Sequence, residues 1–487
     1  MSRQKKLNVL FASFEAVPFF KSGGLGDVAG TLPAYINSNL YDVRVILPKL
    51  KAIPKRFADK MEYLCNYEVP LGWRRQYCGL FRLRYKGVTY YFLDNEFYFF
   101  RNNAYGEFDD GERIAFFSKA VLETIAHLPD FKPDILHCND WHTALCPVFL
   151  RAHYSGIPSY DGIKTIFTVH NLKFQGQYSD YLYGDILGLE GYPAGDTILR
   201  GYGGGRSVNY LQGALLCSDR ITTVSPSYAD EICGEYYGEQ MDGIFRARRG
   251  VLSGILNGID YKLFDPEHDP LIAENFGPDS LGKKKANKLA LQKELGLEES
   301  EEVPVFALIS RLTEQKGLDL LTYILPDLMG RKMQLVILGI GDRKYEEAFS
   351  WYAGKYPSKM AAVLSFDEAL SHRIYAGADA VLIPSRFEPC GLTQMMAMRY
   401  GSLPVVRETG GLRDSVIPYN KYTGEGTGFS FANFNAGELL DAMDKAMELY
   451  SHPRKWAAVQ KNAMAQDFSW HTSAKKYRQL YRELAGK

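Results

Sequence analysis

Short runs of apolar residues alternate along the chain with segments of helical periodicity. In the first half, the apolar runs cover residues 8–13, 43–47, 89–93, 134–138, 164–169 and 220–224. Between two of them, Arg113 to Leu128 repeats apolar residues at helical spacing. Strands that alternate with helices in this way predict a parallel α/β sheet covered by helices.

A second series of the same kind begins after the turn-rich stretch Ser253 to Asp260. Its apolar runs cover residues 305–310, 334–339, 361–366, 380–384 and 403–407. The pattern predicts two doubly wound domains joined near residues 245–258, in agreement with a length of 487 residues. The Lys-rich stretch Asp279 to Lys293 predicts a helix with a solvated face. The amphipathic stretch His471 to Leu484 predicts a last helix that crosses back onto the first domain.

Composition narrows the possible partners. Lysine and arginine total 57, as do aspartate and glutamate, so the formal net charge is zero. This balance argues against a broad surface for nucleic acid or for an anionic membrane. No run of about 18 apolar residues occurs, so an ordinary membrane span is not expected.

Neither the N-terminus nor the cysteines suggest export. The basic stretch Met1 to Leu7 is followed by a short apolar run that Glu15 interrupts, which is unlike a secretory signal. The seven cysteines are odd in number and include no C-x-x-C pair, so neither a disulfide framework nor a zinc knuckle is indicated. The expected location is cytoplasmic, or the plastid stroma for a plant-type source.

A glycine-rich segment follows the first predicted strand. Residues Lys21 to Gly30 read K-S-G-G-L-G-D-V-A-G and lead into a helix. Glycines allow close approach of a ligand to the backbone, and a helix N-terminus favours anions. The spacing differs from the dinucleotide fingerprint, so an NAD site is only weakly indicated. A flexible turn without a ligand is the alternative interpretation.

Two motifs at predicted strand ends suit a diphosphate and a sugar. In the segment Pro384 to Gln394, Glu388 lies just past a buried strand and a helix starts near Leu392, so the backbone amides of Gly391 to Thr393 can face a ligand. Arg311 and Lys316 follow another strand, and two cations suit a diphosphate leaving group. The alternatives are a structural loop with a capping glutamate and a surface pair of cations. No Asp-x-Asp motif occurs in the chain, which favours cations over a metal for offsetting diphosphate charge.

Histidines and an aspartate end two more predicted strands. The segment His137 to His142 includes Asp140 but matches no standard zinc spacing. A structural loop or a ligand contact from Asp140 or His142 is therefore favoured over a metal site. His170 and Asn171 end the strand 166–169, where a ligand contact and a satisfied core histidine are both possible.

Together these motifs resemble the bacterial glycogen synthase and plant starch synthase family, and the resemblance covers nearly the whole chain. The matching segments are Lys21 to Val28, Asp140 to His142, Phe167 to Asn171, Leu256 to Asp260, Ser310 to Gly317, Pro384 to Gln394 and Thr409 to Leu412. The resemblance implies a GT-B fold of two doubly wound Rossmann-like domains that face a deep interdomain cleft. It implies an acceptor-side domain at 1–250, a nucleotide-sugar domain at 251–464, and a C-terminal helix at about 465–487 on the first domain.

The resemblance also implies a reaction. A retaining hexosyltransferase moves glucose from ADP-glucose to the nonreducing 4-OH of glycogen or another α-1,4-glucan, with no metal and no organic cofactor. The implied catalytic residues are Glu388 beside the sugar hydroxyls, Arg311 and Lys316 on the diphosphate, His170 near the anomeric carbon, and Asp140 near the sugar or acceptor. The residues do not distinguish a front-face displacement from a covalent intermediate.

Further residues are assigned to substrate binding by the same resemblance. They are Lys21, Gly24, Asp27, Asn171, Asn257, Phe366, Cys390, Gly391, Leu392 and Thr393. Phe366 takes the position of the ring that stacks on adenine, where bacterial relatives often have Tyr. Cys390 is either a reactive thiol or a small packing residue.

Three alternative functions remain at this stage. One is a related transferase that uses UDP-glucose or a short oligosaccharide acceptor. A phosphorylase is a second, although no segment resembles a site for pyridoxal phosphate. The third is a non-catalytic glucan-binding relative, against which the intact set Glu388, Arg311, Lys316 and His170 argues.

Overall fold

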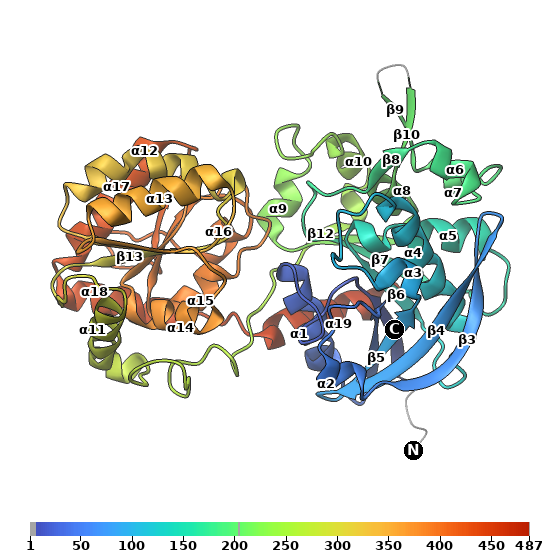
Figure 1. Ribbon diagram of the computed structural model, residues 1–487, viewed down its shortest axis with the longest axis horizontal. Helices are drawn as coiled ribbons and strands as arrows, with labels where there is room; N and C mark the ends of the chain where they lie inside the picture. The colour runs from blue at the N-terminus through green and yellow to red at the C-terminus, as the bar shows by residue number, and fades with distance from the viewer. Residues whose placement is uncertain (1–5, 203–204, 487) are drawn as a thin grey trace. The chain divides into compact units, whose positions relative to one another are not determined.

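A computed structural model describes residues 6–202 and 205–486, which divide into two compact units (Figure 1). The first unit comprises residues 1–224, 229–255 and 470–487, and the second comprises residues 225–228 and 256–469. The predicted boundary at residues 250 and 251 falls before β12 (Leu252–Gly254), which pairs with β11 (Arg220–Thr223) in the first sheet.

The first unit is built on a nine-stranded sheet with the order β12-β11-β7-β6-β1-β2-β5-β4-β3. Seven strands run parallel, and the long pair β4 and β3 continues the sheet in antiparallel fashion. The remaining strands are β1 (Leu7–Ala12), β2 (Tyr41–Pro48), β3 (Glu62–Leu71), β4 (Arg74–Tyr85), β5 (Val88–Asp94), β6 (Ile135–Asn139) and β7 (Lys164–Val169). The parallel strands are buried, as expected for a sheet covered on both faces.

Helices and a small sheet complete this unit. The small sheet has the order β8-β10-β9, formed by β8 (Gln177–Ser179), β10 (Gly205–Asn209) and β9 (Leu199–Tyr202). The principal helices are α1 (Gly24–Ile36), α4 (Asp110–Ala126), α5 (Leu145–His153), α8 (Tyr210–Cys217), α10 (Asp242–Ala247) and α19 (Trp470–Leu484). Short helices occur at α2 (Lys55–Ala58), α3 (Glu96–Phe99), α6 (Tyr181–Asp185), α7 (Pro193–Asp196) and α9 (Pro226–Glu231).

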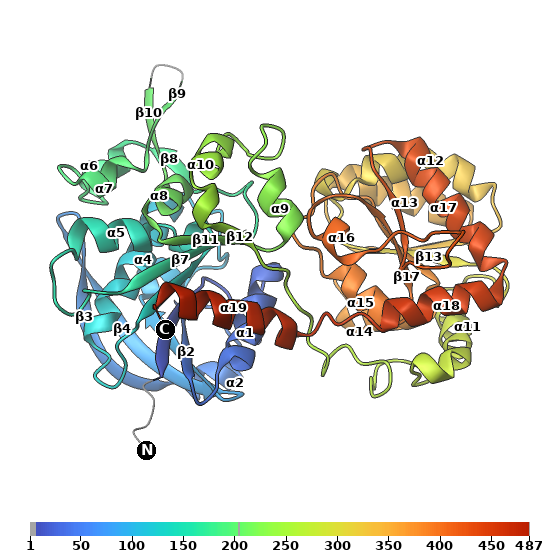
Figure 2. The ribbon, with the colours of Figure 1, turned by 180° about the vertical axis from the view of Figure 1, so that it is seen from behind.

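The last helix, α19, packs on the first unit beside α1 (Figure 2). Its buried residues recur at helical spacing and include Trp470, Tyr477 and Tyr481. The Tyr481 hydroxyl lies 2.7 Å from Nδ1 of His137 on β6, and Nε of Arg478 donates to the carbonyl of Ile36 at 3.1 Å. These contacts join the C-terminal helix to β6 and α1 of the first unit.

The second unit holds a six-stranded parallel sheet with the order β15-β14-β13-β16-β17-β18. Its strands are β13 (Val305–Ile309), β14 (Gln334–Leu338), β15 (Met360–Val363), β16 (Ala380–Ile383), β17 (Leu403–Arg407) and β18 (Phe429–Phe431). Its helices are α11 (Lys284–Glu294), α12 (Leu318–Met329), α13 (Arg343–Lys355), α14 (Glu368–Gly377), α15 (Thr393–Arg399), α16 (Gly410–Ser415), α17 (Ala436–Tyr450) and α18 (Pro453–Met464).

Two sequence predictions need correction in this unit. The run 361–366 predicts a strand, but β15 ends at Val363, so Phe366 lies in the loop beyond it. The Lys-rich helix around α11 is not simply solvated, because Lys284 and Lys288 are buried. Nζ of Lys284 donates to the carbonyls of Tyr375 and Ala376 at the end of α14, and Nζ of Lys288 lies 2.8 Å from Oδ2 of Asp379.

The strand orders fix where ligands can bind. In the second sheet the chain runs from β13 outwards through β14 and β15 and then returns to β16 on the other side of β13. In the first sheet the same reversal separates β1 from β6. Open parallel sheets bind ligands at the carboxyl ends of the strands beside such a reversal.

Candidate active site

Several of the predicted residues of the second unit gather where β13 and β16 end. Lys316 belongs to the short 3-10 turn Glu314–Lys316 that follows β13, and Glu388 belongs to the loop between β16 and α15. These two strands are neighbours in the sheet, so residues 72 positions apart in sequence meet at one edge. Lys316, Glu388, Gly391, Leu392 and Thr393 line a single cavity there.

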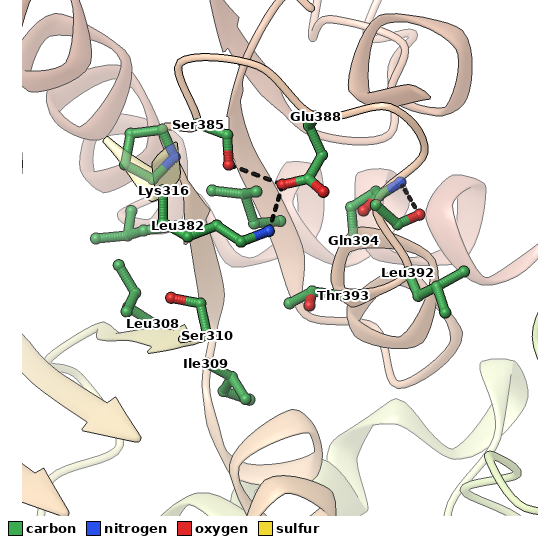
Figure 3. Close-up of a pocket in the computed structure, with 13 residues that line it drawn as sticks. Leu308, Ile309, Ser310, Lys316, Leu382, Ser385, Glu388, Leu392, Thr393 and Gln394 are labelled. Carbon is green, nitrogen blue, oxygen red and sulfur yellow. Dashed lines mark hydrogen bonds and ion pairs between the residues drawn. The ribbon is translucent and has the colours of Figure 1, made fainter. Parts of the chain in front are cut away.

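An ion pair forms the centre of this cavity (Figure 3). Nζ of Lys316 lies 2.6 Å from Oε2 of Glu388, and the Ser385 hydroxyl donates to the same oxygen at 2.9 Å. Glu388 is buried, with 7% of its surface exposed. A buried carboxylate needs partners of this kind, and here they fix the direction in which it points. The geometry holds one carboxylate and one ammonium ready for a polar ligand.

Two glycines allow the loops around Glu388 to pack closely. Gly317 has φ +70°, and a Cβ there would lie 1.9 Å from the carbonyl oxygen of Pro384. A Cβ on Gly411 would lie 1.9 Å from the carbonyl oxygen of Cys390, and the Gly411 amide donates to the Glu388 carbonyl at 3.0 Å. Backbone contacts therefore hold the Glu388 loop from both sides.

Arg311 and Phe366 stand apart from the Lys316–Glu388 pair. Arg311 is the second residue after β13, but it is exposed, and it does not line the cavity around Glu388. The ring of Phe366 is 82% exposed in the loop after β15, the strand at the sheet edge beside β14. Other rings, such as Phe108 and Tyr422, are exposed to a similar extent, so the stacking role of Phe366 stays a prediction.

Cys390 and Asn257 form a second pair behind the Glu388 loop. Cys390 is buried and hydrogen-bonded to Asn257, and burial raises the pKa of its thiol to about 12. A thiol that stays protonated at neutral pH is a poor nucleophile, which favours the packing interpretation of Cys390 over a reactive thiol. Oδ1 of Asn257 is buried without a hydrogen-bond partner among the described residues, which leaves one acceptor for a ligand or water.

In the first unit, Asp140 stands at the end of β6 in a strained conformation. Its φ is 56° and its ψ is 178°, a region that side-chain-bearing residues rarely occupy. The carboxylate Oδ1 accepts the amide of His170 at 2.7 Å and also bonds the amide of Asn171. In this backbone conformation the carboxylate faces the end of β7. Burial raises the pKa of Asp140 to about 7.

His170 is held as a neutral ring beside Asp140. Its Nε2 lies 2.9 Å from Oδ1 of Asn139, whose amide nitrogen donates to the carbonyl of Ala12. With the Asn139 oxygen as acceptor, Nε2 carries the proton. Burial lowers the pKa of His170 to about 3, so the ring is uncharged at neutral pH. Strands β1, β6 and β7 together position this group.

The glycine-rich segment forms the start of α1. Gly24 is the first residue of α1, and no side chain caps the N-terminus at Gly23. Lys21 pairs with Asp27 across the first turn, with Nζ 2.7 Å from Oδ2. The carboxylate of Glu15 accepts the amide of Ser22 and bonds the amide of Gly23, so this side chain anchors the segment.

Three residues in these sites were not predicted. Ser385 holds Glu388, Asn139 holds His170, and Glu15 holds the glycine segment. Each is a polar residue at or just past the end of a buried strand, which was the available signal. Sequence alone did not show that their partners would be the predicted site residues.

Within the described ranges, no group of three or more His, Cys, Asp or Glu side chains is arranged to hold a metal ion. Among the helices of the same residues, none is both long and apolar enough to cross a membrane.

The two units with doubly wound sheets and charged groups at their strand ends define the GT-B class of glycosyltransferases.

Solved structures agree with this class. The catalytic domain of starch synthase IV from Arabidopsis thaliana, bound to ADP and acarbose, has a TM-score of 0.90 and 32% identity. The match covers 99% of this chain and 100% of that one. Sucrose-phosphate synthase from Thermosynechococcus elongatus, at 16% identity and a TM-score of 0.62, shares the fold.

Sequence comparisons identify the family. The family model "Starch synthase catalytic domain" matches residues 8–247, and the model "Glycosyl transferases group 1" matches residues 292–463. Glycogen synthase of Desulfitobacterium hafniense is 48% identical over 98% of this chain and 99% of its own length. Glycogen synthase of Clostridium perfringens is 50% identical over 99% of both. The chain belongs to the glycogen synthase and starch synthase family, as the motifs predicted.

Proposed function

We propose that this glycogen or starch synthase transfers glucose from ADP-glucose to the nonreducing 4-OH of an α-1,4-glucan, with retention of the α-configuration. The observation that carries the proposal is the Lys316–Glu388–Ser385 group at the β13–β16 edge. The related starch synthase from Arabidopsis thaliana is described as bound to ADP and acarbose, which supports an adenine nucleotide as the donor.

The second unit is assigned to the donor. Arg311 and Lys316 bind the diphosphate and stabilise the negative charge that develops as it leaves. The amides of Gly391, Leu392 and Thr393 add donors to the same phosphates, and Gly24 does so from the first unit. Phe366 stacks on the adenine, and Asn257 lines the donor site. Fixed cations and amides replace a metal in this assignment, so the reaction needs no added cofactor.

Glu388 is assigned to the transferred glucose. Its carboxylate accepts hydrogen bonds from the sugar hydroxyls, and its negative charge stabilises the positive charge that develops at the anomeric carbon. The ion pair with Lys316 couples these tasks, because the same ammonium faces both the carboxylate and the departing phosphate. When a bound diphosphate draws the Lys316 ammonium towards itself, the negative charge of the Glu388 carboxylate is less neutralised and acts more strongly on the sugar.

The first unit is assigned to the reacting sugar and the acceptor. His170 is neutral, and because its Nε2–H donates to Asn139, only Nδ1 is left to accept a hydrogen bond near the anomeric carbon without adding charge. Asp140 orients the His170 and Asn171 backbone, and it contacts the sugar or the acceptor hydroxyl. Lys21 and Asp27 flank the glycine segment at the donor side.

The donor assignment is tested with two nucleotide sugars. Incorporation of labelled glucose into glycogen is measured with ADP-glucose and with UDP-glucose, separately and without added metal. The proposal predicts a strong preference for ADP-glucose and an α-linked product. Preference for UDP-glucose would refute the assignment of ADP-glucose as the donor but would leave the glucosyltransferase activity in place. No transfer from either donor by folded protein would favour a glucan-binding role.

A further inference from the structure

The loop that carries Glu388 contains no helix or strand, yet each of its backbone carbonyls from residue 385 to residue 391 accepts a hydrogen bond. The donors are the side chains of Arg407, Gln315, Ser225 and Gln394 and the backbone amide of Gly411. Buried carbonyls of a loop need such partners, because no neighbouring strand or helical turn supplies them. Side chains therefore hold most of this loop in place.

One of these donors, Ser225, comes from a distant part of the chain. It belongs to the short segment 225–228, which is part of the second unit although the chain on both sides of it is part of the first. Ser225 is fully buried, and its hydroxyl donates to the carbonyl of Pro389 at 2.6 Å. The same oxygen accepts the amide of Tyr228 at 3.2 Å, so the hydroxyl is held from both of its sides.

A second pair of hydrogen bonds fixes the 225–228 segment. The amide and the hydroxyl of Ser227 donate to the two carboxylate oxygens of Asp414, at 2.8 and 2.7 Å. Asp414 lies on α16, the helix whose residue Gly411 donates its amide to the carbonyl of Glu388 at 3.0 Å. The contacts therefore close a ring that runs from the Glu388 loop through the 225–228 segment and α16 back to the same loop.

The proline next to Glu388 makes this ring stiff where it matters. A proline ring fixes its own φ at about −65° and restricts the residue before it to extended backbone. Few torsions between Glu388 and the carbonyl of Pro389 can therefore absorb a movement. A shift of the Pro389 carbonyl reaches the backbone of Glu388 and, with it, the carboxylate.

We propose that Ser225 is a positioning residue for glucosyl transfer, which acts on Glu388 through the carbonyl of Pro389. The inference rests on the proposed role of Glu388 at the transferred glucose. Ser225 does not line the cavity around Glu388, so loss of its hydroxyl leaves the lining of the cavity chemically unchanged. It takes a donor from a buried carbonyl, and the loop relaxes to offset that loss. The expected consequence is slower turnover at an unchanged affinity for the donor.

Steady-state kinetics of the full chain test the proposal, with glycogen as the acceptor and ADP-glucose as the varied substrate. Ser225→Ala should lower kcat by about tenfold, because a displacement of about 1 Å can cost about 10²-fold and the loop has other donors. The KM for ADP-glucose should stay within about twofold of that of the wild type. Ser225→Thr keeps the hydroxyl and should restore kcat to within about threefold of the wild type.

Asp414→Ala tests the other end of the 225–228 segment. Asp414 is exposed, so the variant should fold even where Ser225→Ala does not. It removes the acceptor of both Ser227 hydrogen bonds and leaves the bond from Ser225 to Pro389 in place. We therefore expect a smaller effect, a fall in kcat of about threefold.

Ser402→Ala is the matched control. Ser402 is also fully buried, and its hydroxyl donates to the carbonyls of Tyr375 and Ala378 at 2.7 Å. Like Ser225, it accepts a hydrogen bond as well, in this case from Nζ of Lys284. It stands just before β17, and the carboxyl end of this five-residue strand is about 17 Å away. Ser402→Ala should lower the thermal midpoint as Ser225→Ala does, with kcat unchanged.

Four results would overturn the role of Ser225. They are a folded Ser225→Ala enzyme with kcat within about twofold of the wild type, an equal loss of kcat in Ser402→Ala, a folded Ser225→Thr enzyme as slow as Ser225→Ala, and an unchanged kcat in Asp414→Ala. Glu388→Gln, assayed in the same way, separates this inference from the proposed function. Full turnover by Glu388→Gln would refute both, whereas a slow Glu388→Gln beside a fast Ser225→Ala would refute the role of Ser225 alone.

Discussion

The close packing of Gly411 against the Glu388 loop gives a prediction that can be worked from the structure. In Gly411→Ala, the new methyl carbon would lie 1.9 Å from the carbonyl oxygen of Cys390 and 2.5 Å from its Cα. Real Cβ atoms essentially never approach other atoms closer than 3.0 Å, so the difference between 3.0 Å and 1.9 Å requires a shift of about 1.1 Å.

This shift must reach Glu388. The clashing atoms are backbone atoms of the Glu388–Cys390 loop, and the Gly411 amide bonds the Glu388 carbonyl directly. A displacement of about 1 Å at a catalytic group can cost about 10²-fold in rate. We therefore expect Gly411→Ala to lower kcat by about 10²-fold, measured as initial rates of glucose transfer from saturating ADP-glucose to glycogen.

Gly354→Ala is the matched control, because Gly354 lies on α13 and a Cβ there would meet no atom within 4 Å. Its activity should equal that of the wild type. Circular dichroism and thermal melting establish that both variants are folded. A folded Gly411→Ala enzyme with kcat within about threefold of the wild type would refute the reasoning.

Three further predictions concern single residues. Ser385→Ala removes the 2.9 Å hydrogen bond to Glu388. It should lower kcat by about tenfold with little change in the KM for glucan. An unchanged kcat would show that Ser385 does not position Glu388. Burial raises the pKa of Asp140 from 3.8 to about 7, so the folded chain binds the proton of this carboxyl group more tightly than the unfolded chain does. The contribution of Asp140 to the free energy of unfolding therefore falls as the pH rises from about 4 to about 7. The thermal midpoint of the wild type should therefore fall more over this window than that of Asp140→Asn, and parallel curves would contradict the shift. Iodoacetamide should alkylate the half-buried Cys65 and Cys233 before the buried Cys390, as measured by peptide mass spectrometry. Equally fast labelling of Cys390 would show that its thiol is reactive.

Much of the fold could be predicted because parallel strands buried on both faces appear in the sequence as continuous apolar runs. The same runs placed Lys316 and Glu388 at strand ends, where open sheets bind ligands. The long antiparallel strands β3 and β4 were not predicted, since their sequences contain neither the continuous apolar runs that mark the parallel strands nor a regular alternation of apolar and polar residues.

The details of the site depend on strand order, which sequence does not give directly. The contact of Lys316 with Glu388 requires β13 and β16 to be neighbours, and the bond from the His170 amide to Asp140 requires the same of β6 and β7. The conformation of Asp140, with φ 56° and ψ 178°, has no sequence signal, because this region is otherwise occupied almost only by glycine. Lys284 and Lys288 were misjudged because their partners come from distant elements.

The central claim is that Glu388, held by Lys316 and Ser385, supports glucosyl transfer. The most direct test is incorporation of glucose from ADP-glucose into glycogen by the wild type and by Glu388→Gln, which keeps the shape of the side chain and removes its charge. The account predicts that the folded variant loses about 10²-fold or more in turnover. Turnover close to that of the wild type would contradict it.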